Sequence, residues 1–284
     1  MTQKFNSKQE HYIANGITKQ LLLRSKIAES FNNNPFSENY IISSLPGMGK
    51  TYEAKQQTTN NDVVWIEGSS TMAFFTIQIA TAVYLADGEP LVIVLDDCDV
   101  IFEAANANTA KKMFDDTKRL KYNKMRKGLK AMCSDISWEA IESFSTPESP
   151  GFAVPLDNVT FIVLSNRLLP TSNQVDSLQQ GSKKHTTATD LLAIRRRTNA
   201  ETIDMELFDL WGYVANVTLN EQICQKFYPT ISSDEQHQLV NWLYHNWESV
   251  TERNLSIVEK MTKDMVRFPD KYLDIWEANY VEVV

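Results

Sequence analysis

The sequence predicts a doubly wound α/β core, with a parallel sheet flanked by helices, followed by a small all-helical domain. Four short apolar runs recur along the first two thirds of the chain: YIISS (40–44), VVWIEG (63–68), LVIVLDD (91–97) and FIVLSN (161–166). Each is rich in β-branched residues almost throughout, as strands covered on both faces are. The segments between them are long enough for crossover helices, and this alternation favours a parallel sheet.

The remaining elements of the core follow from spacing. Apolar residues at helical intervals predict an N-terminal helix over residues 9–31, which the run NNNPF (32–36) breaks. Crossover helices are expected at residues 50–57, at 71–86 and at about 104–144. A fifth strand is expected at TIDM (202–205), and the polar stretch 171–190 is expected to be a surface loop.

After residue 211 the pattern changes to amphipathic helices without clear strands. The segments that show it are LNEQICQKFY (219–228), SSDEQHQLVNWLYHNWESV (232–250) and SIVEKMTKDMVRF (256–268). We therefore expect two domains, an α/β core with its N-terminal helix over 1–210 and a helical lid over 211–284.

Composition narrows the class of protein. Of 284 residues, 43% are hydrophobic and 23% charged, which is ordinary for a soluble globular chain. The net charge of −8 gives no global field toward nucleic acid or anionic membrane, so any such contact must be local. Three widely spaced cysteines indicate free thiols in a reducing compartment. We expect a cytoplasmic protein, because the N-terminus lacks the apolar region of a secretion signal and the apolar stretch 73–86 is too short to span a bilayer.

The stretch SSLPGMGKTYEA (43–54) ends a predicted strand and carries most of a phosphate-binding loop. The rule G-x-x-x-x-G-K-[ST] is met from Gly49 onward, but Ser44 stands at the first glycine position. Backbone N–H groups of residues 47–49 can wrap an anion at the start of the following helix. Lys50 would reach the β- and γ-phosphates and Thr51 would bind Mg²⁺ through its hydroxyl. The alternative is an ordinary turn between strand and helix.

A second element supports the loop. The apolar strand LVIVLDD delivers Asp96 and Asp97 at its carboxyl end, where doubly wound sheets bind their ligands. Asp96 would bind Mg²⁺ directly or through water, and Asp97 would polarise the water that attacks the γ-phosphate. Acidic residues also end strands with no such role.

With these motifs the sequence resembles the AAA+ ATPase superfamily over about residues 40–205. LPGMGKT is similar to its Walker A loop, LVIVLDD to its Walker B strand and FIVLSN to its sensor 1 strand. The resemblance implies ATP and Mg²⁺ as cofactors and Asn166 as the residue that helps to position the attacking water. The nucleotide-binding residues would be Pro46, Gly47, Met48, Gly49, Lys50, Thr51 and Tyr52. The family usually has Asp-Glu where this chain has Asp96-Asp97, so slower hydrolysis is an open alternative.

The resemblance also implies a homo-oligomer, a ring or a spiral, in which a neighbour donates an arginine finger just before the last core strand. Arg195, Arg196 and Arg197 lie there, and Arg196 and Arg197 are preferred. A basic helix end that complements its own dipole is the other interpretation. Arg253 is the candidate sensor 2 arginine, although a capping box at Ser256 and Glu259 would place it before the helix.

Two segments are candidate client surfaces. Residues 68–76 (GSSTMAFFT) could be a pore loop in which Met72, Phe74 and Phe75 grip a polymer, or the buried first turn of a helix. Residues 118–130 (KRLKYNKMRKGLK) are the densest basic run. Read as a helix, this run puts only Arg119, Arg126 and Lys130 on one stripe, so a solvated helix and a DNA-facing insertion both remain open.

The sequence thus predicts an ATP-hydrolysing AAA+ enzyme that remodels or loads a macromolecular client, with DNA replication or processing as the leading role. A protein-remodelling ATPase is the main alternative, and a slowly hydrolysing ATP-dependent switch or scaffold is another. A small-molecule P-loop kinase is disfavoured, because no second substrate motif accompanies the sensor 1 match. The four histidines show no metal-ligand spacing.

Overall fold

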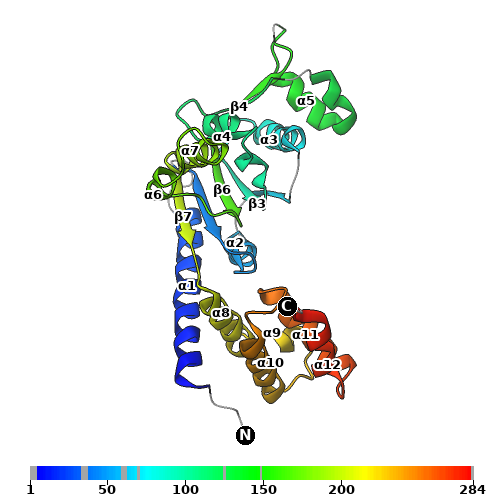
Figure 1. The fold of residues 1–284 in the computed structure, drawn as a ribbon. Coiled ribbons are helices and arrows are strands. Elements are labelled where there is room, and N and C mark those ends of the chain that lie inside the picture. Colours follow the sequence, from blue (N-terminus) through cyan, green and yellow to red (C-terminus); the bar gives the residue numbers. More distant parts are fainter. Residues whose placement is uncertain are drawn as a thin grey trace. The chain divides into compact units, whose positions relative to one another are not determined.

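The computed structural model describes residues 5–32, 38–58, 63–68, 71–123, 126–147 and 149–282, without the side chains of residues 126 and 127. The strands are β1 (Tyr40–Ser44), β2 (Val63–Glu67), β3 (Leu91–Asp96), β4 (Arg119–Tyr122), β5 (Phe152–Pro155), β6 (Val159–Ser165) and β7 (Asn199–Ile203). The α-helices of the first 200 residues are α1 (Ser7–Asn32), α2 (Lys50–Gln57), α3 (Met72–Ala86), α4 (Ala107–Met113), α5 (Asp135–Ser143), α6 (Ser172–Asp176) and α7 (Lys183–Arg195). Those that follow are α8 (Leu207–Asn220), α9 (Ile223–Phe227), α10 (Ser233–Asn246), α11 (Leu255–Arg267) and α12 (Tyr272–Tyr280), and two 3-10 helices are η1 (Asp99–Phe102) and η2 (Arg126–Met132) (Figure 1).

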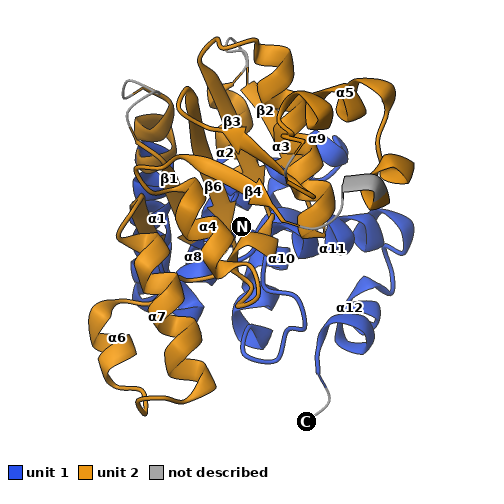
Figure 2. Ribbon diagram, turned by 90° about the horizontal axis from the view of Figure 1, so that it is seen from above, with its two compact units in different colours: residues 1–25, 44–50, 203–284 blue, residues 26–43, 51–202 orange. Residues whose placement is uncertain are grey.

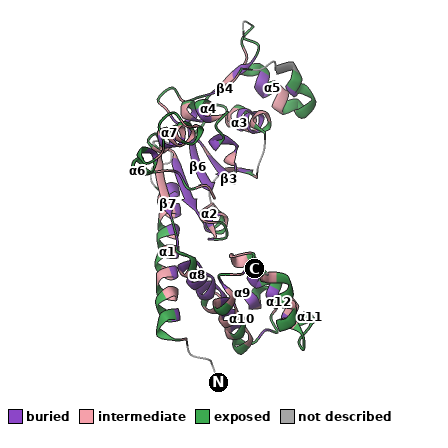
Figure 3. Ribbon diagram, in the orientation of Figure 1, coloured by how far each residue is buried: buried purple, intermediate pink, exposed green. Residues whose placement is uncertain are grey.

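The five-stranded sheet confirms the predicted fold class. Its strand order is β2-β3-β6-β1-β7, and the pairs β2–β3, β3–β6 and β6–β1 are parallel. All residues of β1 and β6 are buried, which explains why their apolar residues, 40–42 and 161–164, follow one another rather than alternate (Figure 3). The fifth strand is also present but begins earlier than expected, at Asn199. The predicted break at 32–36 falls almost wholly outside the described residues.

The stretch of about 104–144, expected to hold crossover helix, is only partly helical. It forms α4, then β4, then η2 and α5, and β4 pairs antiparallel with β5. In β4 the side chain of Leu120 is fully buried, while Arg119 and Lys121 on either side of it are exposed. That alternation is the period of a strand, and Leu120 belongs to the same buried core as residues of α3 and of the five-stranded sheet. The polar stretch 171–190, expected to be a loop, holds α6 and the first part of α7.

The chain groups into two compact units (Figure 2). Unit 1 comprises residues 1–25, 44–50 and 203–284, and unit 2 comprises residues 26–43 and 51–202. The sheet and the hairpin β4–β5 belong to unit 2, apart from single residues at the ends of β1 and β7. The expected domains, 1–210 and 211–284, remain a prediction.

Unit 1 is built around three tryptophans and a close helix contact. Trp211, Trp247 and Trp276 are fully buried, and each indole N–H donates to a backbone carbonyl. Helices α1 and α8 approach backbone to backbone: a Cβ added to Gly16 would lie 2.2 Å from the Tyr213 nitrogen. Within the described part of the chain, no helix has the length and apolar character needed to cross a membrane.

Candidate nucleotide site

The phosphate loop runs from the last residue of β1 to the first of α2. Gly47 has φ +76° and Gly49 has φ +79°, a left-handed backbone that glycine adopts without cost. Ser44 does not share this conformation, so its Cβ creates no strain at the position where the loop rule has glycine. Around them, Pro46 and Tyr52 are exposed and Met48 is buried.

The ammonium of Lys50 turns back toward the start of the loop. It donates to the Ser44 carbonyl (3.2 Å), the Ser44 hydroxyl (3.0 Å) and the Leu45 carbonyl (3.2 Å). Only 5% of Lys50 is exposed, so these acceptors replace water around a buried charge. The serine at the first loop position therefore supplies a hydroxyl acceptor that glycine would lack.

Two other residues of unit 1, Asn254 and Tyr213, lie close to the glycines of the loop. A Cβ added to Gly47 would lie 2.1 Å from Cβ of Asn254, and one added to Gly49 would lie 2.9 Å from the hydroxyl of Tyr213. Asn254 caps α11, since its side chain accepts from the N–H of Ser256. Helix α11 of the C-terminal region thus begins directly against the phosphate loop.

Arg253, the sensor 2 candidate, precedes that cap. Its Nε donates to the Trp247 carbonyl at 2.9 Å, and its terminal nitrogen donates to the Glu248 carbonyl. The predicted capping box at Ser256 and Glu259 is wrong, because the capping residue is Asn254, two residues earlier, and the helix begins at Leu255.

In unit 2 the first residue after Lys50 meets the Walker B strand. The hydroxyl of Thr51 donates to Oδ2 of Asp96 at 2.7 Å, and Asp96 is 7% exposed. Magnesium at nucleotide sites takes oxygen ligands, few of them from protein and the rest from phosphates and water. A hydroxyl and a carboxylate already within contact distance are a donor set that fits this ion. The described residues include no cluster of three His, Cys, Asp or Glu side chains that would bind a metal without phosphate.

Asp97 and Asn166 meet at the carboxyl ends of neighbouring strands. The Asn166 amide donates to Oδ1 of Asp97 at 2.7 Å, and the Asp97 N–H donates to the Leu164 carbonyl at 3.1 Å. Asp97 has φ +54°, a left-handed conformation that is uncommon for a residue other than glycine. The predicted carboxylate and the predicted sensor residue are therefore in direct contact.

Cys98 lies behind this pair but is not a nucleophile. Its thiol lies 3.2 Å from the Ile66 carbonyl, as a buried hydrogen-bond donor. Burial first, and then the nearby carboxylates of Asp96, Asp97 and Asp99, together raise the pKa of the Cys98 thiol to about 12. Reaction requires the thiolate, so this cysteine stays inert at neutral pH.

The three candidate finger arginines differ in their surroundings. Arg195 is tied to the Leu169 carbonyl at 2.8 Å, whereas Arg196 and Arg197 are exposed and line a pocket of about 500 Å³. They precede β7, whose first residue, Asn199, donates its N–H to the carbonyl of Asn39, just before β1. Both strands thus begin at the same edge, which is the edge opposite the carboxylates.

The segment 68–76 divides between surface and core. Phe75 is fully buried in the first turn of α3, so it is not available to grip a polymer, while Phe74 is 41% exposed. Thr71 caps this helix, accepting from the N–H of Phe74. Residues 69 and 70 lie outside the described residues.

Among the described residues the basic run 118–130 divides between β4 and η2, so the interpretation of the run as one helix with a shared stripe is wrong. Arg119 and Lys121 lie on the exposed face of β4, and together with Lys112 and Thr117 they line a pocket of about 390 Å³. Lys130 lies on η2 with its ammonium 5.3 Å from the centre of the Trp138 ring. The side chain of Arg126 is outside the described part.

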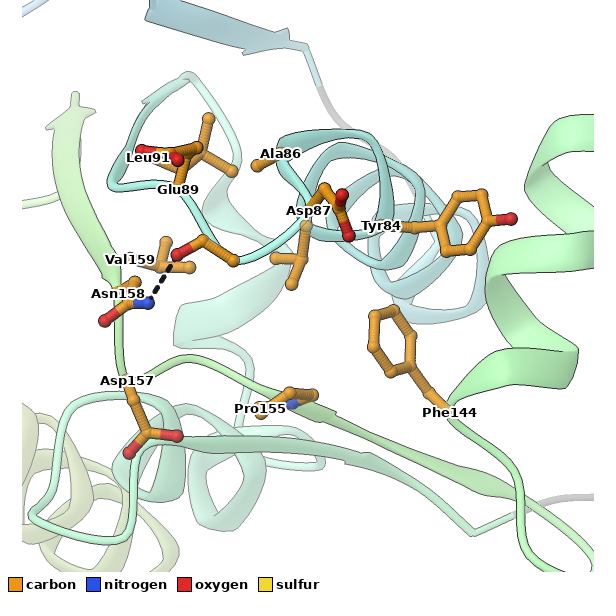
Figure 4. A pocket seen from close by; sticks show the side chains of 12 residues that line it. Tyr84, Ala86, Asp87, Glu89, Leu91, Phe144, Pro155, Asp157, Asn158 and Val159 are labelled. Carbon is orange, nitrogen blue, oxygen red and sulfur yellow. Dashed lines mark hydrogen bonds between the residues drawn. The ribbon is translucent and has the colours of Figure 1, made fainter.

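A further pocket, of about 360 Å³, lies at the amino ends of β3 and β6 (Figure 4). Its lining includes Tyr84, Phe144 and the carboxylates of Asp87 and Asp157. Strands β3 and β6 carry the candidate catalytic residues at their other ends. This pocket is therefore separate from the nucleotide site.

Comparison with known proteins yields structures alone. No family model matches the sequence, and no curated protein matches it. One matching solved structure is RuvB of Thermotoga maritima, described as a Holliday junction branch migration motor; it is 11% identical, with a TM-score of 0.43, over 92% of this chain and 68% of that one. A proline-to-glycine variant of the same protein matches at 12% identity and a TM-score of 0.43, over 94% and 70% of the two chains. The assignment of residues therefore rests on the motifs and on the geometry above.

Proposed function

We propose that this chain is a Mg²⁺-dependent ATPase of the AAA+ type that works as an oligomer on a macromolecular client. The observation that carries the proposal is the pairing of motif residues that lie far apart in the sequence. Thr51 meets Asp96 at 2.7 Å, and Asp97 meets Asn166 at 2.7 Å. A chance Gly-Lys-Thr in a turn would give no reason for either contact.

Each residue has a role in phosphoryl transfer to water. The backbone of residues 47–49 and the ammonium of Lys50 bind the phosphates, with Lys50 exchanging its loop acceptors for phosphate oxygens. Thr51 and Asp96 would hold Mg²⁺, which offsets negative charge on the phosphates when bound. Asp97 polarises a water that Asn166 positions. The water oxygen bonds to the γ-phosphorus, the bond to the bridging oxygen breaks, ADP leaves and the water's proton is released.

The arginines support catalysis between subunits. Arg196 and Arg197 stand at the amino edge of the sheet, while Asp97 and Asn166 stand at its carboxyl edge. A strand of five residues spans about 17 Å, farther than an arginine side chain extends. The arginine side chains therefore do not reach Asp97 and Asn166 of the same chain. A finger from this segment must act on the nucleotide site of a second copy.

Two measurements test the proposal. Steady-state ATP hydrolysis is expected for the wild type and not for Lys50→Ala. An equimolar mixture of Lys50→Ala chains and Arg196→Ala/Arg197→Ala chains should recover roughly a quarter of the wild-type rate, since random assembly pairs an intact loop with intact arginines at that share of interfaces. Tight ATP binding with turnover no higher than Lys50→Ala would contradict hydrolysis and favour a nucleotide-dependent switch. Absence of recovery in the mixture would contradict the shared site.

For the client we propose nucleic acid, in keeping with a role in DNA replication or processing. The exposed face of β4 and the end of α4 gather Lys112, Arg119 and Lys121 around one pocket. Among the described residues none of the three forms an ion pair with a carboxylate, so their charges are available to phosphates. Cations on a strand face contact a nucleic-acid backbone without reading its sequence.

The double reversal Arg119→Glu/Lys121→Glu tests this client. It should abolish stimulation of ATP hydrolysis by DNA and lower the salt dependence of single-strand binding by about 0.7 per lost phosphate contact. The double reversal Lys183→Glu/Lys184→Glu, on exposed lysines that begin α7, is the matched control. Equal DNA binding by both double variants would remove the assignment.

A protein client is the second candidate, and one observation favours it. Phe74 lines an apolar groove of about 630 Å³ beside the sheet-edge strand β2, together with the exposed Leu85 and Met132. A threaded or docked polypeptide would find apolar contacts there. A Phe74→Ala variant that keeps DNA stimulation but loses stimulation by unfolded polypeptide would support this client.

A further inference from the structure

We infer that Ser165 and Asp99 are positioning residues that hold Asn166 against Asp97, an inference that rests on the proposed ATPase function for its catalytic meaning. Neither residue has been given a role at the site: Ser165 precedes Asn166 within the FIVLSN motif, and Asp99 lies after the LVIVLDD motif. Both lie one or two positions from a residue that has such a role. They connect the end of β6 to the segment that follows β3.

The hydroxyl of Ser165 is both a hydrogen-bond donor and a hydrogen-bond acceptor. It donates to Oδ1 of Asp99 at 2.7 Å and accepts the N–H of Arg167 at 2.9 Å. Ser165 is fully buried, so water cannot replace either bond. The first bond reaches across to the neighbouring strand's loop, and the second closes the turn around Asn166.

The opposite segment needs such support. Asp97 holds a left-handed backbone with φ +54°, and conformations of this kind persist only where the surroundings impose them. Its N–H is bonded to the Leu164 carbonyl. Two residues further on, Asp99 receives the Ser165 hydroxyl. The bend at Asp97 is thus fixed on both sides by the end of β6.

The two segments are joined by two side-chain bonds that run in parallel. Asn166 donates to Asp97, and Ser165 donates to Asp99. A third hydrogen bond, from the Arg167 guanidinium to the Phe102 carbonyl at 2.9 Å, also joins these two segments. If the Ser165 bond is removed, the turn that carries Asn166 loses its closure, and the amide can rotate away from the carboxylate that polarises water.

The expected consequence is a defect in the chemical step alone. Ser165→Ala should lower kcat for ATP hydrolysis by about 10- to 100-fold, because small misplacements of positioning groups cost rates of that order. The affinity for Mg-ATP should change by less than about twofold, since Lys50 and Thr51 are untouched. Asp99→Asn keeps an oxygen acceptor for Ser165 and should retain most of the rate, whereas Asp99→Leu should not.

A double-mutant cycle and a control variant distinguish a positioning role of Ser165 from a general contribution to stability. In an Asn166→Ala background the change Ser165→Ala should have no further effect on kcat, because residues that act through one another are not additive. Ser30→Ala removes another fully buried serine hydroxyl of unit 2, bonded at 2.7 Å to the Ile27 carbonyl, and should leave kcat unchanged. Additive losses, or an equal loss in Ser30→Ala, would overturn the inference.

The decisive measurement does not need turnover. In chains with ¹⁵N-labelled asparagine, the side-chain amide of Asn166, assigned by its loss in Asn166→Ala, should be protected from exchange in the wild type and exposed in Ser165→Ala. An amide that stays protected in Ser165→Ala would refute the inference even if the ATPase assignment stands. Conversely, hydrolysis that survives in Lys50→Ala would refute the ATPase assignment, while the amide still reports whether Ser165 positions Asn166.

Discussion

Replacing Gly47 with alanine should damage the phosphate loop by two separable effects. The residue has φ +76°, where a Cβ costs about 1–2 kcal/mol. The same Cβ would lie 2.1 Å from Cβ of Asn254 and 3.0 Å from its Cα, so the loop and the start of α11 must move apart. Overpacking of this kind typically costs about 1–3 kcal/mol. The sum is about 2–5 kcal/mol in the free energy of unfolding.

The second effect can be removed by itself. Asn254→Gly eliminates the obstructing Cβ, and glycine at a helix N-cap costs only a few tenths of a kcal/mol relative to asparagine. In the double variant Gly47→Ala/Asn254→Gly the Cα of residue 254 remains 3.0 Å from the added Cβ, so most of the overpacking cost of about 1–3 kcal/mol should return while the backbone cost stays. Urea unfolding of the two single variants and the double variant gives this coupling, and titration with a fluorescent ATP analogue follows the loop's function.

Strict additivity of the two substitutions would refute this reasoning. It would mean that the loop and the cap of α11 are not in contact in solution. A Gly88→Ala variant serves as the control for φ alone, since Gly88 has φ +86° with no atom near the added Cβ. It should show the backbone cost, and Asn254→Gly should not rescue it.

Two other predictions concern unit 1. Gly16→Ala should lower the free energy of unfolding by about 1–3 kcal/mol or more, because the new methyl meets backbone of α8 at 2.2 Å, and urea unfolding measures it. The Lys260 ammonium, followed by the Ser256 hydroxyl, holds the pKa of Glu252 below its ordinary value of 4.5. The ionised Glu252 carboxylate therefore stabilises the fold fully above the ordinary pKa of 4.5, and this stabilisation is lost as pH falls through the lower pKa of the folded state. Unfolding midpoints of wild type and Glu252→Gln should differ at pH 7 and converge in acid; a constant difference would exclude the linkage.

The sheet was predictable because its strands are covered on both faces. In residues 40–42 and 161–164 the apolar side chains follow one another without alternation, which is typical of a parallel strand covered on both faces. Once these strands are placed, the carboxyl-edge rule places Asp96, Asp97 and Asn166 together. The contact between the last two follows from the strand order β3–β6, which the sequence alone does not specify.

The hairpin was not predictable in the same way. Its first strand, RLKY, alternates over only four residues, and the basic residues around it favour the interpretation of one solvated helix. Its second strand, FAVP, is four residues long and ends in proline, which weakens any strand prediction. The pairing of these two strands decides the structure, and pairing is a tertiary property.

Contacts between distant backbones leave even less trace in the sequence. Gly16 sits within a helix, where glycine weakens stability by itself, and its value lies only in letting α8 approach. Asn254 caps α11 where the sequence predicts Ser256 as the cap, and its contact with Gly47 depends on where α11 begins. Neither relation has a fixed spacing that a motif could record.

The serine at the first position of the loop shows how a motif should be applied. Glycine is required where φ is positive, at Gly47 and Gly49, and the loop has it there. Ser44 does not have a positive φ, so a residue with a side chain fits there without strain, and that side chain can form a hydrogen bond. Its hydroxyl accepts from Lys50, which keeps a buried ammonium bonded while no phosphate is present. The departure from the rule therefore falls at the one glycine position whose conformation does not need glycine, and it leaves the phosphate-binding positions intact.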